Sequence, residues 1–139
     1  MISEGQSSSS VFPQVTGDKG KKPTIGTPSG TPPTTLQKQD IYLGTGKEAL
    51  ANSTLEVHYT LVTWSAGQIA DSSWERGQSA TFPLSGVIAG WQEGIPGMKE
   101  GGRRLLVIPP DLGYGAQGAG GAIGPNETLV FVVDLIAVS

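Results

Sequence analysis

Residues that could do acid–base, nucleophilic or metal chemistry are few in this chain. It has one histidine, His58, and no cysteine, which excludes thiol nucleophiles, thiolate metal sites and sites built on several imidazoles. The carboxylates occur singly and form no pair spaced as a general acid and base, although carboxylates distant in the chain can still meet in the fold. We therefore expect a function that needs no metal and no cofactor.

Two glycine-rich segments are similar to nucleotide-binding loops, but their context argues against that function. Residues 113–118 match the pattern G-x-G-x-x-G, which binds dinucleotides only where a strand leads straight into a helix. Pro109 and Pro110 separate this segment from the preceding apolar run, and the glycines and proline that follow do not favour a helix. Residues 44–47 lack the spacing of a phosphate-binding loop and are better explained as a turn.

An aromatic residue beside glycines is the remaining unusual feature. Trp91 lies within residues 87–94, between Gly90 and Gly94. Taken alone, this tryptophan is better explained as a core residue than as part of a binding site. His58 lies on the polar side of an alternating segment, where a structural role is more frequent than a functional one.

The composition predicts one small domain made of short elements. The chain has 139 residues, of which 21 are glycine and 10 are proline, and this content favours turns and short strands over long helices. Charged residues make up 15% and the formal net charge is −3, so we expect no nucleic-acid partner. No apolar run approaches the ~20 residues of a membrane-spanning helix.

The chain divides into an N-terminal segment and a domain. Residues 1–40 contain five of the ten prolines and a run of four serines, with few large apolar residues. We predict a flexible Ser/Pro/Gly/Thr-rich tether over residues 1–35, in which residues 11–15 could dock on the domain, and a folded domain over residues 36–139. Met1 is not followed by a signal sequence, which leaves two locations open: the cell envelope after loss of an upstream signal, or the cytoplasm.

Apolar periodicity predicts the elements of the domain. Residues 55–61 alternate as a half-buried strand, and residues 129–138 are apolar on both faces, as in a central strand. Residues 104–108 form another predicted strand, 81–84 an edge strand, and 89–98 a helix of about two turns. With a single helix available, the sequence predicts an α+β fold with a mostly antiparallel sheet.

The ordered motifs of residues 36–139 resemble those of the FKBP-type peptidyl-prolyl cis-trans isomerases. The segments that carry the resemblance are Val57-His58-Tyr59-Thr60, Asp71-Ser72-Ser73, Val87-Ile88-x-Gly90-Trp91-x-Glu93-Gly94, Ile108-Pro109, Tyr114-Gly115-Ala116 and Asn126-x-Thr128-Leu129-Val130-Phe131. The segment from Asp71 to Gly77 is similar to the bacterial branch in particular. The resemblance implies a five- to six-stranded antiparallel sheet wrapped around one short helix, with a ligand pocket between them.

The resemblance also implies which residues form that pocket. Trp91 would be its floor, and its walls would be Tyr59, Phe82, Val87, Ile88 and Phe131. Tyr114 and the Ile88 N–H would donate hydrogen bonds to the carbonyl groups of a ligand, and Asp71 would accept one. A flap over residues 115–125 would contribute Ile123. From the residues alone, Asp71 could instead cap a turn and Tyr114 could be an amphipathic residue of the rim.

The implied activity is acceleration of rotation about Xaa–Pro bonds by a monomer that acts on proline-containing polypeptides. Where the family usually has larger residues, this chain has Ala70, Ala80 and Ala119, which predicts a wider pocket and weaker binding of macrolide inhibitors. The alternatives are a non-catalytic module that binds proline-containing peptides, a chaperone on the same fold, or a purely structural domain.

Overall fold

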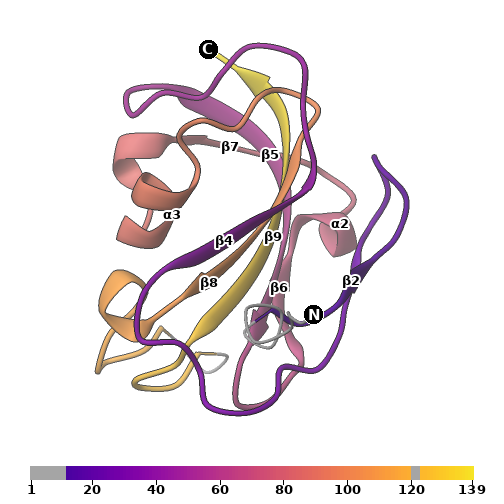
Figure 1. The fold of residues 1–139 in the computed structure, drawn as a ribbon. Helices are drawn as coiled ribbons and strands as arrows, with labels where there is room; N and C mark the ends of the chain where they lie inside the picture. Colours follow the sequence, from indigo (N-terminus) through magenta and orange to yellow (C-terminus); the bar gives the residue numbers. More distant parts are fainter. Residues whose placement is uncertain (1–11, 120–122) are drawn as a thin grey trace, which may run out of the picture.

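An antiparallel sheet of six strands organises the molecule (Figure 1). The computed structural model describes residues 12–119 and 123–139. Along the sheet the order is β4 (Gln37–Tyr42), β8 (Arg103–Ile108), β9 (Leu129–Val138), β5 (Thr54–Thr63) and β6 (Ile69–Ser72), and β7 (Ala80–Pro83) also pairs with β5. β7 pairs with residues 54–57 of β5 and β6 with residues 60–62, so both lie on the β5 edge opposite β9.

The predicted strands are present, and β9 has the central position that its two apolar faces indicated. Leu55, Val57, Tyr59 and Leu61 of β5 all belong to one buried cluster, as the alternation predicted. β7 is an edge strand that pairs only with β5. β4 and β6 were not predicted from local periodicity: β4 is a largely exposed, polar edge strand, and β6 has only four residues.

Within residues 12–119 and 123–139, two short α-helices accompany the sheet. α3 (Ala89–Gly94) ends earlier than the predicted 89–98, because Pro96 lacks the N–H that a continuing helix needs. α2 (Ser73–Arg76) is a single turn that ends at Gly77 with φ 73°, and one turn is too short to show a helical period. Two 3₁₀ turns, η1 (Leu84–Gly86) and η2 (Pro110–Leu112), complete the described helical segments.

Helix α3 packs closely on one face of the sheet because two of its residues have no side chain. A Cβ at Gly90 would lie 2.5 Å from Cγ2 of Ile108, and a Cβ at Gly94 would lie 2.7 Å from Cδ2 of Leu106. Distances this short do not occur between real Cβ atoms and their neighbours. The two glycines therefore set the distance between helix and sheet, and Trp91 is held between them.

Two buried arginines of β8 link this strand to its neighbours. Nε of Arg104 lies 2.7 Å from Oδ1 of Asp40 on β4, and its Nη1 donates to the carbonyl oxygen of Gly94 at the end of α3. Arg103 is fully buried, and its Nε lies 2.9 Å from Oδ1 of Asp134 on β9. Burial raises the pKa of Asp134 even though Arg103 acts to lower it.

The opposite face of the sheet is also apolar, and the N-terminal segment covers it. Its cluster consists of Val62, Trp64, Leu105, Val107, Val130 and Val132. Phe12, Val15 and Ile25 pack against this cluster; the latter two belong to β2 (Val15–Thr16) and β3 (Thr24–Ile25), which form a two-stranded antiparallel hairpin. We call residues 12–35 the N-terminal cover.

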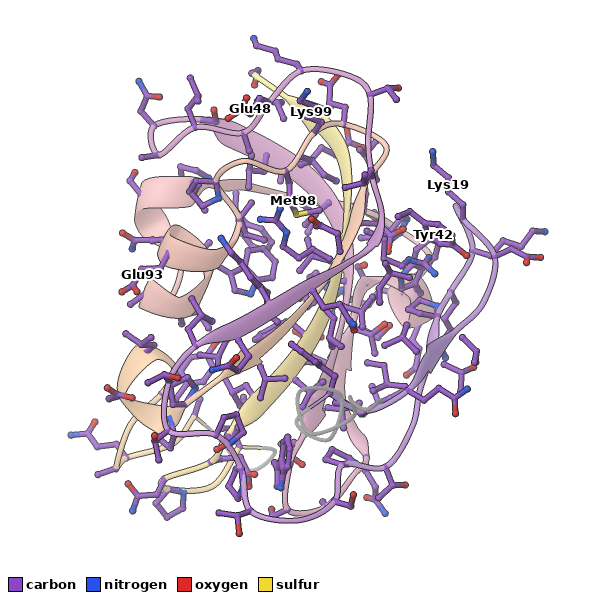
Figure 2. The ribbon with its side chains drawn as sticks, viewed as in Figure 1. Lys19, Tyr42, Glu48, Glu93, Met98 and Lys99 are labelled. Atoms are coloured by element: carbon purple, nitrogen blue, oxygen red, sulfur yellow. The ribbon has the colours of Figure 1, made fainter. Side chains whose placement is uncertain are left out.

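Polar contacts also join the N-terminal cover to the sheet. The hydroxyl of Tyr42 donates to the carbonyl oxygen of Gly17, and Figure 2 shows Tyr42 beside the hairpin that carries Lys19. Nε1 of Trp64 donates to the carbonyl oxygen of Gly30 over 3.1 Å. Arg103 donates through Nη2 to the carbonyl oxygen of Lys21.

These contacts differ from the free tether expected over residues 1–35. The N-terminal cover has few large apolar residues, but the sheet offers them an apolar face, and this complementarity was not visible in the segment alone. Residues 1–11 lie outside the described residues, and the division of the chain at residue 35 stays a prediction. Within the described residues, no helix is both long and apolar enough to cross a membrane.

Candidate active site

A partly enclosed cavity of about 520 Å³ lies between helix α3 and the concave face of the sheet. All nine residues that the sequence predicted for the site line it: Tyr59, Asp71, Phe82, Val87, Ile88, Trp91, Tyr114, Ile123 and Phe131. Leu61, Ala70, Gly86 and Ala119 complete the lining. The structure thus brings the predicted residues together, while their roles stay predictions.

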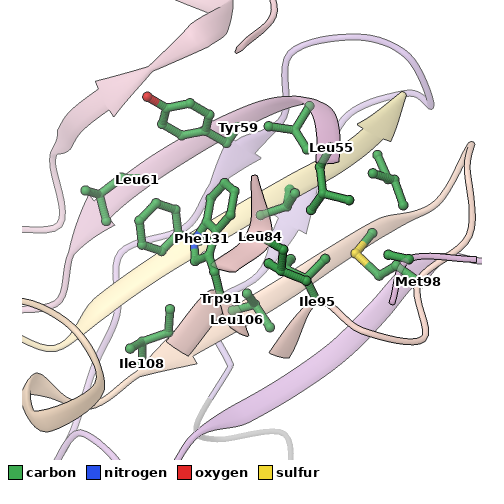
Figure 3. Close-up of a cluster of buried hydrophobic side chains, with 14 of the residues drawn as sticks. Leu55, Tyr59, Leu61, Leu84, Trp91, Ile95, Met98, Leu106, Ile108 and Phe131 are labelled. Atoms are coloured by element: carbon green, nitrogen blue, oxygen red, sulfur yellow. The ribbon is translucent and has the colours of Figure 1, made fainter. Parts of the chain in front are cut away.

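Trp91 forms the centre of an aromatic cluster, with only 3% of its surface exposed (Figure 3). Its ring is nearly perpendicular to the rings of three neighbours. The centroid distances are 5.3 Å to Phe131, 5.8 Å to Tyr59 and 5.8 Å to Phe82, with interplanar angles of 83°, 83° and 89°. Edge-to-face pairs are a favoured arrangement of aromatic rings, so the neighbours hold the indole in one orientation.

The strand register explains why these rings meet. Leu61 on β5 pairs with Phe131 on β9, and Tyr59 lies two residues before Leu61 on the same face. Phe82 pairs with Leu55 on the other edge of β5. The first turn of α3 places Trp91 above these strands. Three strands and one helix therefore contribute one ring each to the site.

The polar side of the cavity is a hydrogen-bonded group of three side chains. The Tyr59 hydroxyl donates to Oδ2 of Asp71 over 2.6 Å, and Figure 3 shows this hydroxyl pointing away from the Trp91 and Phe131 rings. Arg76 donates through Nη2 to the Tyr59 oxygen over 2.9 Å and through Nη1 to Oδ1 of Asp71. Sequence reasoning did not single out Arg76, because the one-turn helix α2 that places it was not predicted.

These bonds set the protonation states of the group. Burial raises the pKa of Tyr59, and the hydrogen bond to Asp71 adds to this shift, so the phenol is neutral near pH 7. Burial acts to raise the pKa of Asp71 too, but the hydrogen bonds from Tyr59 and Arg76 outweigh it and bring that pKa below its ordinary value. Asp71 is therefore a carboxylate whose two oxygens both accept hydrogen bonds inside the protein.

Hydrogen-bond donors for a ligand lie on the other sides of the cavity. Among the described residues, the Ile88 N–H at the start of α3 donates to no backbone oxygen. The Tyr114 side chain is at the rim, with 38% of its surface exposed. A ligand carbonyl can accept from either group without displacing a bond within the described part of the chain.

His58 has the structural position that the sequence favoured. Its Nδ1 lies 2.8 Å from Oγ of Ser73, and its ring stacks on Trp74 at a centroid distance of 3.9 Å. His58 does not line the 520 Å³ cavity. Within residues 12–119 and 123–139, no group of three or more His, Cys, Asp or Glu residues could hold a metal ion.

Together, the fold and this cavity have the features of a ligand-binding protein: a concave, mostly apolar pocket with an aromatic floor and a few polar groups at its edge. The family model of the FKBP-type peptidyl-prolyl cis-trans isomerases matches residues 46–136. The chain belongs to this family and is accordingly an isomerase.

Relatives with similar sequences support the same family assignment. The chain is 52% identical over 117 residues to the "Probable FK506-binding protein" of Corynebacterium glutamicum, a match that covers 84% of this chain and 98% of that protein. It is 47% identical over 105 residues to the "Peptidyl-prolyl cis-trans isomerase Mip" of Coxiella burnetii, covering 74% of this chain and 44% of that protein.

A solved structure confirms the FKBP-like fold. FkpA from Escherichia coli superposes with a TM-score of 0.70 at 41% sequence identity, over 75% of this chain and 48% of that one. The predicted α+β class with a sheet of up to six strands around a short helix is therefore confirmed.

Proposed function

We propose that the cavity accelerates rotation about Xaa–Pro bonds by withdrawing the imide from water and holding the proline ring against Trp91. The observation that carries this proposal is the aromatic floor itself: a buried indole, fixed by three perpendicular rings, under a ligand-sized cavity. The uncatalysed barrier is about 18–20 kcal/mol, because rotation breaks the resonance of the amide.

The chemistry follows from the change in polarity during rotation. A planar imide is strongly polarised by resonance, and the twisted transition state is less so. An apolar, water-poor cavity therefore destabilises the ground state more than the transition state, and only such a difference accelerates the reaction. Every ~1.4 kcal/mol removed from the barrier gives a tenfold faster rate. No proton moves and no covalent bond forms.

Each predicted residue has a place in this scheme. Trp91 supports the proline ring, and the remaining walls exclude water. Tyr114 and the Ile88 N–H hold carbonyl groups of the chain on one side of the rotating bond. Asp71 and Arg76 are positioning residues, which hold the Tyr59 ring at the wall of the cavity.

The width of the cavity affects how tightly we expect inhibitors to bind. Ala70 and Ala119 both line it, where larger side chains would occupy part of the space. Macrolide inhibitors of the family should therefore bind with reduced affinity, because part of their apolar surface finds no partner. We expect the protein to act as a monomer on proline-containing polypeptides.

Xaa-Pro peptides in a protease-coupled assay, with and without a macrolide inhibitor, test the proposal. The expected result is saturable acceleration that high inhibitor concentrations abolish. Peptide binding without acceleration would instead identify a non-catalytic binding module. Suppression of aggregation regardless of proline content would identify a chaperone, and the absence of both effects would leave a structural domain.

A further inference from the structure

A second cavity of about 440 Å³ adjoins the first on the side of α2 and β7. It is lined by Arg76, Gln78, Ser79, Ala80 and Thr81. The two cavities are neighbours because Arg76 of the second is hydrogen-bonded to Asp71 and Tyr59 of the first. A polypeptide whose proline lies in the first cavity can therefore continue into the second within a residue or two, since an extended chain spans about 3.3–3.6 Å per residue.

Strand β7 contributes one residue to each cavity on the same face. Ala80 precedes Phe82 by two residues on β7, so the two side chains point to the same face of the strand. Phe82 lines the first cavity and Ala80 lines the second. Because the Ala80 side chain ends at its Cβ, it occupies little of the second cavity, and a larger side chain at this position would fill part of it.

Arg76 presents a fixed cation in the second cavity. A guanidinium group has five N–H donors, and Arg76 directs one from Nη1 to Asp71 and one from Nη2 to Tyr59. Three donors remain, and half of the side chain, 51%, is exposed. Its orientation is set by two bonds before any ligand arrives, which reduces the entropy lost on binding.

The nearby carboxylates already have partners of their own. Oε2 of Glu56 accepts from Ser79 Oγ over 2.7 Å, and Oε2 of Glu75 pairs with Nζ of Lys22 over 2.8 Å. Asp71 neutralises part of the Arg76 charge, but both of its oxygens are occupied by Arg76 and Tyr59. The remaining Arg76 donors suit an acceptor from outside, and a carboxylate makes the strongest such bond.

We propose that this second cavity is a subsite for the substrate polypeptide, in which Arg76 binds the carboxylate of an Asp or Glu one or two residues from the proline. The inference rests on the proposed isomerase function and adds a preference to it. Arg76 is thereby a specificity-determining residue as well as a positioning residue.

Matched peptides test the subsite in the chain of residues 1–139. One pair carries Glu or Gln two residues before the proline, and a second pair carries Glu or Gln two residues after it. The readout is the ratio of kcat/KM for Glu over Gln within each pair. A half-exposed ion pair contributes at most about 1 kcal/mol, so we expect a ratio of about two- to fivefold in at least one pair. This ratio should fall towards one in 1 M salt, where the screening length is about 3 Å.

Three variants locate the effect. Arg76→Met and Ala80→Phe should each bring the ratio to one, the first by removing the cation and the second by filling part of the second cavity. Lys22→Met is the matched control: it removes one positive charge beside α2 without touching either cavity, and the ratio should be retained.

Three results would overturn the subsite in distinguishable ways. Equal kcat/KM for Glu and Gln in both pairs, with clear isomerisation of all four peptides, would remove the subsite and leave the isomerase function intact. No acceleration of any peptide would remove both. A ratio that Lys22→Met abolishes as completely as Arg76→Met would reduce the preference to general charge attraction.

Discussion

Replacing Trp91 by phenylalanine tests the aromatic floor, and the same change at Trp64 is its control. Both indoles are buried, with 3% and 8% of their surface exposed, but they lie on opposite faces of the sheet. Trp91→Phe keeps an aromatic ring and leaves a void under the proline position. Trp64→Phe leaves the substrate cavity untouched and removes the hydrogen bond to the Gly30 carbonyl oxygen.

The expected sizes follow from these contacts. We take the transition-state stabilisation lost with one apolar ring contact as ~1.4 kcal/mol. This loss corresponds to a tenfold lower rate. A shift of the reacting group by about 1 Å can cost roughly 100-fold, which sets the upper limit. We therefore expect Trp91→Phe to lower kcat/KM about 10- to 100-fold. Trp64→Phe should leave kcat/KM within about twofold.

Stability must be measured alongside activity. Each variant should lose about 1–3 kcal/mol of unfolding free energy, through a packing defect at Trp91 and an unpaired carbonyl at Trp64. This loss is smaller than the unfolding free energy of a typical domain, about 5–15 kcal/mol, so both variants should stay folded. If the two variants lost stability equally and also lost kcat/KM equally, activity would follow the integrity of the sheet, and the reasoning about the floor would be refuted.

Four further outcomes are expected. Activity should be nearly flat from pH 6 to 8, because the pKa of Asp71 is lowered and that of Tyr59 is raised, away from this range; a bell-shaped profile would contradict it. The stability that ionised Asp71 contributes is present above its unfolded pKa of about 3.9 and is lost as the pH falls through its lower folded pKa, which acid titration of the melting temperature would detect. Chelators should leave the isomerisation rate unchanged, and a rate restored only by added metal would oppose the scheme. Deletion of residues 1–35 should lower the melting temperature and cause self-association in sedimentation experiments, whereas a stable monomer would show that the N-terminal cover is dispensable.

A strand could be predicted from the sequence where its own apolar residues follow a regular pattern and are buried. β5 and β9 alternate or are apolar on both faces, and their local signal agrees with their tertiary position. β4, β6 and α2 have no such signal, because each is short or largely exposed. Their structure depends on the strands beside them, which local periodicity does not contain.

The site residues could be predicted only through the ordered motifs. Trp91 on its own was better explained as a core residue, and it is indeed buried. What distinguishes it is the cavity above it, and that depends on residues far away in the chain, such as Tyr59 and Phe131. Arg76 was missed for a related reason. Its importance lies in two hydrogen bonds to Tyr59 and Asp71, and neither bond has a signature in the local sequence.

The two faces of the sheet show why one apolar surface can stay open while the other must be covered. The concave face keeps a cavity because α3 packs on part of the cluster and leaves space above Trp91. On the other face, the apolar cluster packs against the N-terminal cover, and without that cover it would be an exposed apolar patch. An enzyme that binds unfolded, proline-containing chains gains from a single apolar opening, because a second one would hold the same chains where no rotation is accelerated. The hairpin of β2 and β3 covers apolar surface on which such chains would otherwise find a second place to bind.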